Sequence, residues 1–223
     1  MDIKEATVFW ITVKNQKKLA TLNNADVNQA YNEMQVEKNG KQYNTWSPYR
    51  SKLAAAIING LEIFPILKKT KVLYLGTNEK TASHISDIVG IGGKIFVVRD
   101  IMKNTKNFSD GPANNRTNVF TINYDKNNLE QFSSEIETVD VIYLDTTQTN
   151  KIEITIENCK NYLVNGGYLM LVVPTKNTDV TENHNKQDLE ERKKMQPSFD
   201  IIQQINLTDF FKGYSMIIAK YLG

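Results

Sequence analysis

Few residues of this sequence are of the types that commonly act as nucleophiles or metal ligands. The 223 residues include one cysteine, Cys159, and two histidines, His84 and His184. A cysteine becomes nucleophilic when a neighbouring group favours its thiolate, and two histidines offer little choice of such a base. We therefore interpret Cys159 as a buried structural thiol. Because neither histidine has partners at the spacing of a metal site, we predict no metal centre.

The composition is that of a globular chain with little excess charge. Hydrophobic residues make up 40% and charged residues 23%, and the formal net charge is +2. A protein that holds RNA alone usually carries a stronger basic excess, so any RNA partner is expected to be gripped with the help of other subunits. The longest apolar stretches, such as residues 168–173, are far too short to cross a bilayer. We predict a soluble, cytoplasmic protein, with Asp87 and the charges of residues 186–194 on solvated helix faces.

Residues 1–46 are predicted to form a small β-rich unit. The segment TVFWITV at residues 7–13 is rich in β-branched and aromatic side chains, which favour strands. A polar turn is predicted at residues 15–18. Asn39 and Gly40 form the dipeptide most typical of a tight hairpin turn, so a second hairpin is expected there.

Residues 47–223 are predicted to form the main domain, which opens with a helix. Ser47 followed by Pro48 has the form of a helix start, with a serine cap and a proline in the first turn. The helix is predicted over residues 49–60, and Gly60 is suited to end it because glycine readily adopts the left-handed conformation found there.

Beyond the first helix the pattern alternates between strands and helices. Strands are predicted at residues 72–75, 94–98, 118–122, 139–144, 167–173, 199–205 and 214–220. Helices are predicted at residues 80–89, 150–163 and 185–195. The middle strands are almost continuously apolar, which indicates a parallel sheet covered on both faces. The last two strands are joined by only residues 206–213, too few for a parallel crossover, so they should form an antiparallel hairpin. A Rossmann-like α/β sheet of seven strands with one antiparallel strand is typical of S-adenosylmethionine (AdoMet)-dependent methyltransferases.

Several segments carry a resemblance to one family. The segment WSPYRSKLAAAI at residues 46–57 is followed by VLYLG at residues 72–76 and by VDVIYLDTTQ at residues 139–148. Shorter matches are NGGY at residues 165–168 and TDVT at residues 178–181. Together they resemble the archaeal type of fibrillarin, and the resemblance covers essentially the whole chain, the N-terminal β unit included.

The resemblance implies an activity and a set of partners. Fibrillarins are the methyl-transferring subunits of box C/D guide-RNA particles, which modify the ribose 2′-hydroxyls of ribosomal RNA and, in archaea, of transfer RNA. A Nop-domain scaffold protein holds them, and a kink-turn-binding protein anchors the guide RNA. The expected cofactor is AdoMet, and the expected partners are a Nop-domain protein and guide or ribosomal RNA.

The resemblance assigns the cofactor turn to the residues that follow the first strand of the main domain. The family shows a turn with two glycines, where the backbone approaches the cofactor closely. Here Gly76 matches the first glycine, while Lys80 replaces the second and one residue is missing. Gly76 therefore either serves the cofactor or merely ends a strand. The candidate cofactor-binding residues are Gly76, Thr81, Asp100, Asp125 and Gln148.

Two acidic positions of the cofactor site are displaced by one residue. The family carries an acidic residue at the end of its second strand, where carboxylate oxygens accept the ribose hydroxyls of the cofactor. Arg99 occupies that position here, with Asp100 beside it. Asp100 substitutes only if the strand ends or bulges there, because neighbouring side chains of a strand point oppositely. After the third strand, Tyr124 stands where the family has an aspartate, and Asp125 follows.

The family's catalytic set is Lys-Asp-Lys completed by His or Glu. A ribose hydroxyl is a poor nucleophile and needs a base or a cation beside it. Lys52 and Asp145 match two members of the set, whereas Pro174 and Tyr214 replace the second lysine and the histidine. Lys176 is the alternative second lysine. Lys52 and Asp145 are either a catalytic remnant or a structural ion pair across the cleft.

Two functional hypotheses follow from these departures. In the first, the chain is a non-catalytic fibrillarin paralogue that binds a Nop-type protein or RNA, because the scaffold segments match while cofactor and catalytic positions do not. In the second, it is an active RNA 2′-O-methyltransferase with a remodelled site that uses Lys52, Asp145 and Lys176. Calorimetric titration with AdoMet discriminates between them.

Overall fold

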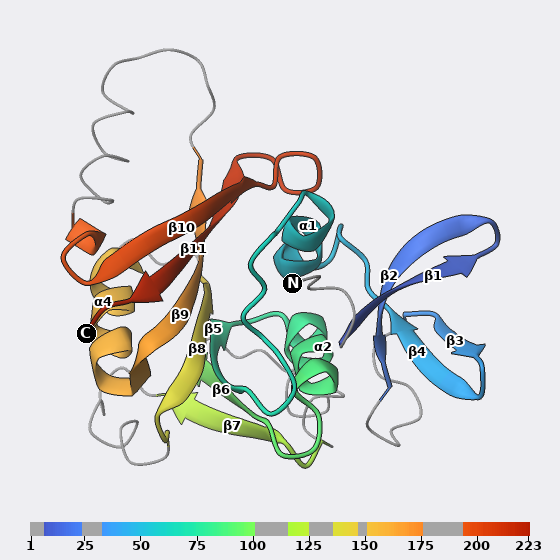
Figure 1. Ribbon diagram of the computed structural model, residues 1–223, viewed down its shortest axis with the longest axis horizontal. Helices are drawn as coiled ribbons and strands as arrows, with labels where there is room; N and C mark the ends of the chain where they lie inside the picture. Colours follow the sequence, from blue (N-terminus) through green and yellow to red (C-terminus); the bar gives the residue numbers. More distant parts are fainter. Residues whose placement is uncertain (1–6, 24–32, 101–115, 125–135, 147–150, 176–193) are drawn as a thin grey trace.

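The computed structural model describes residues 7–23, 33–100, 116–124, 136–146, 151–175 and 194–223. These residues form two β-sheets with helix α2 between them, and the smaller sheet lies to the right in Figure 1. The side chains of residues 99, 100, 123, 124 and 151 lie outside the description. No helix among the described residues is long and apolar enough to cross a membrane.

The small sheet is antiparallel throughout, with the strand order β1-β2-β4-β3. Its strands are β1 (Val8–Val13), β2 (Gln16–Leu22), β3 (Gln35–Lys38) and β4 (Lys41–Thr45). The predicted hairpin at Asn39 and Gly40 is confirmed, and both residues have the positive φ angles, 54° and 70°, that a type I′ turn requires. The first turn lies at Lys14 and Asn15, ahead of its predicted place, because β2 already begins at Gln16. The division between domains at residue 46 remains a prediction.

The first helix begins later than predicted. Helix α1 spans Lys52–Ile58, and Ser51 caps it through a hydroxyl that accepts from the backbone N–H of Ala54 at 3.4 Å. The predicted start at Ser47 is wrong, because the carbonyl of Arg50 accepts a hydrogen bond from the Asn78 side chain at 2.5 Å and the chain stays extended at Ser51. The helix ends as expected, with Gly60 just beyond it at a φ of 96°.

The large sheet confirms the predicted fold class. Its strands are β5 (Lys71–Gly76), β6 (Lys94–Asp100), β7 (Val119–Tyr124), β8 (Val139–Asp145), β9 (Leu163–Pro174), β10 (Phe199–Asn206) and β11 (Tyr214–Tyr221). The order is β10-β11-β9-β8-β5-β6-β7, and β11 runs antiparallel to both of its neighbours while β9, β8, β5, β6 and β7 are parallel. The hairpin of the last two strands is thus present, as their short connection predicts.

Helices cover both faces of the large sheet. Helices α1 and α2 (Glu79–Val89) pack on one face, in a core that also includes Trp46 and Tyr143. Helix α4 (Lys151–Tyr162) lies on the other face, where Cys159 is completely buried. The interpretation of Cys159 as a buried thiol is confirmed, and burial raises its pKa to about 12. The helix predicted at residues 185–195 lies almost entirely outside the described residues.

Candidate functional site

The candidate site lies where the winding of the large sheet changes direction. Strands β5 and β8 are parallel neighbours, and the helices that follow them pack on opposite faces. In sheets of this kind, ligands bind beyond the carboxyl ends of the two strands that flank this switch point. Gly76 ends β5 and pairs with Asp145, which ends β8. Two of the residues predicted for the site therefore lie side by side at its centre.

Lys52 reaches Asp145 from the first turn of α1. Its Nζ lies 2.6 Å from Oδ1 of Asp145, although 93 positions separate the two residues in sequence. The side chains are 18% and 10% exposed, so the pair is largely shielded but remains open to a ligand. Lys52 contacts Oδ1 alone, and among the described residues no hydrogen bond is made to Oδ2. The structure thus brings the two predicted catalytic residues together.

Aromatic rings face the ammonium group of Lys52. Its Nζ lies 4.7 Å from the centre of the Tyr214 ring and 5.5 Å from that of Phe211, distances typical of cation–π contacts. Tyr214 begins β11 and pairs with Pro174, the last residue of β9. The two residues that replace members of the family's catalytic set are therefore neighbours at the same edge of the sheet as Lys52.

Gly76 is required by a side chain of its own strand. A Cβ at this position would lie 2.5 Å from the ring of Tyr74, closer than packed atoms approach one another. The Tyr74 ring folds beneath the turn after β5, and its hydroxyl accepts a hydrogen bond from the backbone N–H of Asn78 at 3.2 Å. Sequence reasoning offered two explanations for Gly76, and the structure adds this third one.

Two stacked tyrosines lie beneath the site. The ring centres of Tyr74 and Tyr143 are 5.2 Å apart with their planes at 22°. Burial, and then the nearby charge of Asp145, hold the pKa of each phenol well above its ordinary value. The Tyr143 hydroxyl has no hydrogen-bond partner among the described residues. The floor of the site is therefore uncharged at ordinary pH.

Thr81 joins the two helices that approach the site. Its Oγ1 lies 2.8 Å from Oγ of Ser51, the cap of α1, and its backbone N–H donates to Oδ1 of Asn78, the cap of α2, at 3.2 Å. Thr81 is completely buried. It fixes the first turn of α1 against the first turn of α2, which positions Lys52, and its cofactor role remains a prediction.

The other predicted site residues are described in part or not at all. Strand β6 is described as far as Asp100, which pairs in regular register with Tyr124 of β7. The side chains of Arg99 and Asp100 lie outside the description, so the replacement of Arg99 by Asp100 in the cofactor site remains a prediction. Asp125, Gln148 and Lys176 lie outside the described residues. Their roles in binding the cofactor or in catalysis remain predictions.

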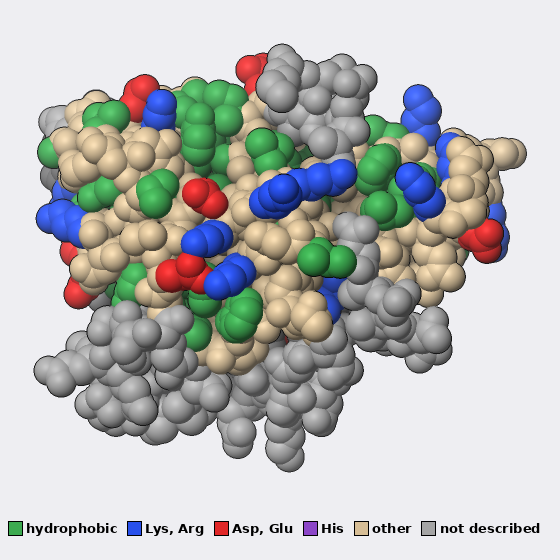
Figure 2. Space-filling view, turned by 60° about the horizontal axis from the view of Figure 1, so that its bottom comes forward, with side chains coloured by type: hydrophobic (Ala, Val, Ile, Leu, Met, Phe, Trp, Pro, Cys, Tyr) green, Lys and Arg blue, Asp and Glu red, His purple; other side chains and the backbone are tan. Residues whose placement is uncertain are grey.

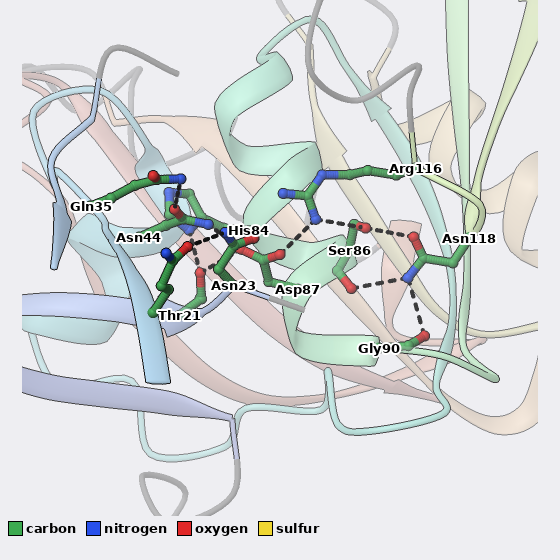
Figure 3. Close-up of polar contacts among 11 residues, drawn as sticks. Thr21, Asn23, Gln35, Asn44, His84, Ser86, Asp87, Gly90, Arg116 and Asn118 are labelled. Atoms are coloured by element: carbon green, nitrogen blue, oxygen red, sulfur yellow. Dashed lines mark hydrogen bonds and ion pairs between the residues drawn. The ribbon is translucent and has the colours of Figure 1, made fainter. Parts of the chain in front are cut away.

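The prediction that Asp87 lies on a solvated helix face is wrong. Asp87 is 2% exposed, and its Oδ1 lies 2.6 Å from Nη1 of the equally buried Arg116 (Figure 3). Its Oδ2 accepts hydrogen bonds from the Thr21 hydroxyl at 2.9 Å and from the Asn44 amide at 3.0 Å. Helix α2 is covered by the small sheet on the side away from the large sheet (Figure 1), so the side of the helix expected to meet water meets β2 and β4 instead.

His84 belongs to the same buried network. Its Nδ1 lies 2.8 Å from the Thr21 hydroxyl and its Nε2 lies 2.9 Å from Oε2 of Glu33. Because the single proton of that hydroxyl is donated to Asp87, Nδ1 carries the hydrogen that Thr21 accepts. The imidazole also stacks on Trp46, with ring centres 4.5 Å apart. Within the described parts of the chain, no group of three or more His, Cys, Asp or Glu residues could hold a metal ion.

Sequence reasoning missed this network because its members are scattered along the chain. Thr21, Asn44 and Arg116 come from two strands of the small sheet and from the segment before β7. One signal was available in retrospect: α2 carries polar residues with short side chains, such as Ser83 and Ser86, which suit a helix packed on both sides.

The sheet order and the position of the site define a class of protein. A parallel sheet with one antiparallel strand, and a lysine–aspartate pair at its switch point, place the chain among proteins with the AdoMet-dependent methyltransferase fold. The family model described as Fibrillarin matches residues 2–223. The chain belongs to the fibrillarin family.

Individual relatives agree with this assignment. The chain is 38% identical over 208 residues to the fibrillarin-like rRNA/tRNA 2′-O-methyltransferase of Sulfurisphaera tokodaii, covering 92% of this chain and 89% of the relative. Its structure is similar to that of Aeropyrum pernix fibrillarin in complex with natively bound S-adenosyl-L-methionine, with a TM-score of 0.86 and 31% identity over 96% of this chain and 94% of the other. Fibrillarin in a fibrillarin/Nop5p complex is also similar, with a TM-score of 0.76 and 28% identity over 97% and 98% of the two chains.

Proposed function

We propose that this chain is an AdoMet-dependent methyltransferase that acts on ribose 2′-hydroxyls of ribosomal or transfer RNA. The observation that carries the proposal is the contact of Lys52 with Asp145 at the switch point of the sheet. The relatives' names support it, because they describe rRNA/tRNA 2′-O-methyltransferases. They favour the active alternative over the non-catalytic interpretation of the sequence.

The residues at this edge of the sheet fit the cofactor's chemistry. Gly76 brings bare backbone to the switch point beside Asp145. Asp100 is the last described residue of β6, the neighbouring strand, and Asp125 directly follows β7 in the sequence. Carboxylates at strand ends accept hydrogen bonds from hydroxyl and amino groups, so Asp100 and Asp125 would hold the ribose and the base of AdoMet. When bound, AdoMet supplies an electrophilic methyl group on a positively charged sulfur.

Lys52 and Asp145 have complementary roles at the attacking oxygen. The 2′-hydroxyl forms the new O–CH₃ bond as the S–CH₃ bond breaks, and its proton moves to Asp145, whose Oδ2 is open to a substrate. The Lys52 ammonium lies beside the same carboxylate, where it faces the negative charge that develops on the oxygen. A base and a cation placed together in this way make a weakly acidic hydroxyl reactive.

A specific observation favours the second candidate function, a non-catalytic binding subunit. Phe211 and Tyr214 turn their rings toward Lys52, and Pro174 lies beside Tyr214. These residues supply neither the second cation nor the imidazole of the family's catalytic set. In this alternative, the Lys52–Asp145 pair holds α1 against β8 and the chain contributes contacts to an assembly.

Under either function, we propose that the chain assembles with a Nop-domain protein on RNA. The structural similarity to fibrillarin in the fibrillarin/Nop5p complex supports a partner of that kind. On the face shown in Figure 2, lysine and arginine side chains of the described residues lie among acidic and apolar ones. Among the described residues, Lys71 and Lys94 share the carboxylate of Glu137, and their hydrogen bonds hold its pKa below the usual value. A surface of this kind is expected of a subunit that binds RNA together with other subunits.

Calorimetry and methylation assays with one pair of variants test the proposal. We expect the full chain to bind AdoMet and to methylate a ribosomal RNA fragment in the presence of guide RNA and a Nop-domain protein. Asp145→Asn should lower the methylation rate about 100-fold or more while AdoMet binding persists, because the amide no longer accepts a proton. Asp200→Asn, on the exposed side of β10, is the matched control and should leave the rate unchanged. Absence of AdoMet binding by the folded protein would instead support the non-catalytic alternative.

A further inference from the structure

The ammonium group of Lys52 has one hydrogen-bond partner among the described residues. Its Nζ donates to Oδ1 of Asp145 at 2.6 Å, whereas an ammonium carries three N–H donors at the end of a flexible four-carbon stem. The side chain is 18% exposed, so most of its surroundings are protein. One hydrogen bond leaves the group free to turn about Oδ1, and a second contact is needed to fix its direction.

The second contact of Lys52 is with an aromatic ring. Its Nζ lies over the Tyr214 ring, 4.7 Å from the ring centre, and over the Phe211 ring at 5.5 Å. The face of an aromatic ring carries partial negative charge and attracts a cation that lies within about 6 Å. Tyr214 is well inside this limit and Phe211 is close to it, so Tyr214 makes the stronger contact. The ammonium is thus held by both a carboxylate oxygen and a ring face.

The backbone that carries the Tyr214 ring is fixed by its own hydrogen bonds. The Tyr214 carbonyl accepts from the N–H of Leu207 at 2.9 Å, and the Tyr214 N–H donates to the carbonyl of Phe211 at 3.2 Å. The carbonyl of Gly213, the preceding residue, accepts from the N–H of Thr175 at 2.7 Å. Gly213 has a φ of 77°, a conformation that favours glycine. The turn between β10 and β11 therefore places the ring without the help of a ligand.

The position of Tyr214 within β11 distinguishes it from an ordinary core residue. Residues 215–219 of this strand are buried, whereas Tyr214, at its start, is partly buried. Tyr214 packs against the core of the α1 face, so its ring is anchored while one face meets Nζ of Lys52. Tyr168 packs against the same core but pairs with Lys220, at the far end of the β9–β11 ladder from Tyr214. Tyr168 is therefore a matched residue for comparison.

We infer that Tyr214 is a positioning residue whose ring face holds the Lys52 ammonium in place against Asp145. The inference rests on the proposed function in that the ammonium has a task there, which is to face the charge that develops on the attacking oxygen. A lysine that is fixed in advance does not lose its conformational freedom at the moment of reaction. The contact needs the ring and not its hydroxyl, so Tyr214 donates and accepts no proton in the reaction.

Methylation kinetics of the full chain, with guide RNA, a Nop-domain protein and a ribosomal RNA fragment, test this role. Tyr214→Ala should lower kcat about tenfold, as expected for loss of a partly shielded cation–π contact, while KM for the RNA stays within about twofold of the wild type. Tyr214→Phe keeps the ring face and should stay within about twofold of the wild type in kcat. Tyr168→Ala removes a tyrosine ring from the same core and should also stay within about twofold.

The mobility of the Lys52 ammonium gives a readout that does not depend on activity. In protein made with isotopically labelled lysine, nuclear magnetic resonance relaxation reports the order parameter of each Nζ group, and the Lys52 signal is identified by its loss in Lys52→Arg. We expect the order parameter of Lys52 Nζ to fall by about half in Tyr214→Ala and to be retained in Tyr214→Phe and Tyr168→Ala. The measurement uses the full chain without RNA or AdoMet.

The outcomes separate this inference from the proposed function. If the wild type does not methylate RNA, but Tyr214→Ala releases the Lys52 ammonium and Tyr214→Phe keeps it fixed, the holding of Lys52 by Tyr214 stands and the methyltransferase proposal fails. If the wild type methylates RNA and Tyr214→Ala leaves either kcat or the order parameter unchanged, the inference is refuted. Equal losses in Tyr214→Phe and Tyr214→Ala would also overturn it, since the hydroxyl rather than the ring face would then make the contact. Equal losses in Tyr168→Ala would reduce the effect to lost packing in the core and contradict the inference as well.

Discussion

Two groups of charged residues lie on the same face of the large sheet and differ in how completely they are satisfied. In the network around α2, the Asp87 carboxylate receives hydrogen bonds from Thr21, Asn44 and Arg116 and is shielded from water. In the candidate site, Lys52 contacts only one oxygen of Asp145, and both side chains retain some exposure. The first group is closed by the protein itself, whereas the second keeps bonding capacity for a ligand.

The contrast shows how to separate structural from functional charge in this fold. A buried charge is stabilised when hydrogen-bond partners surround it, and both oxygens of the Asp87 carboxylate have such partners, two of them from strands β2 and β4. A carboxylate that must accept a proton needs an open lone pair, so a catalytic pair cannot be closed in the same manner. The network therefore anchors the small sheet to α2, and the pair beside β5 remains available for chemistry.

The largest expected effect comes from breaking the network at its centre. Asp87→Ala leaves the Arg116 guanidinium buried without its carboxylate, which should lower the free energy of unfolding by about 3–5 kcal/mol. Asp145→Ala removes a carboxylate from a more open pair and should lower it by less, about 1–3 kcal/mol. Urea denaturation followed by circular dichroism measures both values.

A second variant keeps this test informative if Asp87→Ala fails to fold. Asp87→Asn retains oxygen and nitrogen atoms in place but loses the charge, so it should fold with an intermediate loss of stability. Equal losses of unfolding free energy in the Asp87 and Asp145 variants would show that the network around Asp87 stabilises the fold no more than the Lys52–Asp145 pair does.

A smaller loss of stability is expected when the Thr21 hydroxyl, which contacts both His84 and Asp87, is removed. Thr21→Val keeps the shape of the side chain but removes both hydrogen bonds, which should reduce the free energy of unfolding by about 2 kcal/mol. Thr12→Val, at an exposed position of the neighbouring strand, is the matched control and should change stability by at most about 0.5 kcal/mol. Similar results for the two variants would mean that the Thr21 contacts contribute nothing to anchoring the sheet.

The smallest expected effect concerns Tyr143, which lies beneath the candidate site, and it is a change in how the free energy of unfolding depends on pH. The pKa of the Tyr143 phenol is raised by burial, so above about pH 10 the unfolded chain loses this proton while the folded chain keeps it. The unfolded state then binds fewer protons, and the free energy of unfolding falls as the pH rises. In Tyr143→Phe this contribution is absent, so the alkaline loss at pH 11 should be about 1.4 kcal/mol smaller than in the wild type.

Urea titrations at pH 8 and pH 11 measure this difference. At pH 8, Tyr143→Phe should match or exceed the stability of the wild type, because the hydroxyl that it removes has no partner among the described residues. Parallel alkaline losses in the two proteins would show that the Tyr143 phenol ionises in the folded state.

Local patterns in the sequence were sufficient to predict most of the fold. The apolar runs that became β5, β8 and β9 indicated a covered parallel sheet, and the short connection of residues 206–213 indicated the antiparallel hairpin. Asn39 and Gly40 determined their turn through their own backbone preferences. The meeting of Lys52 with Asp145 could be anticipated only through the family resemblance, since 93 positions separate them.

The errors arose where a distant residue decides a local outcome. Helix α1 begins after Ser51 because the amide of Asn78 engages the carbonyl of Arg50, and nothing near Ser47 reveals that contact. Asp87 is buried because β2 and β4 cover α2. Position 76 holds a glycine because the Tyr74 ring lies where a Cβ would be, and that placement of the ring depends on how the turn after β5 folds back over it.

Strand β11 lies inside the large sheet, between β9 and β10, although it follows both in the chain. A ribosome adds about 5–20 residues per second, so β9 and β10 emerge before the strand that joins them. Both present unpaired edges during that interval, and such edges readily pair with other chains. The aromatic contact of Tyr214 with Lys52 also forms only after β11 has emerged. A pause in translation between β10 and β11 would thus leave a nascent chain with its helices and small sheet made, but with its largest sheet divided and its site unfinished.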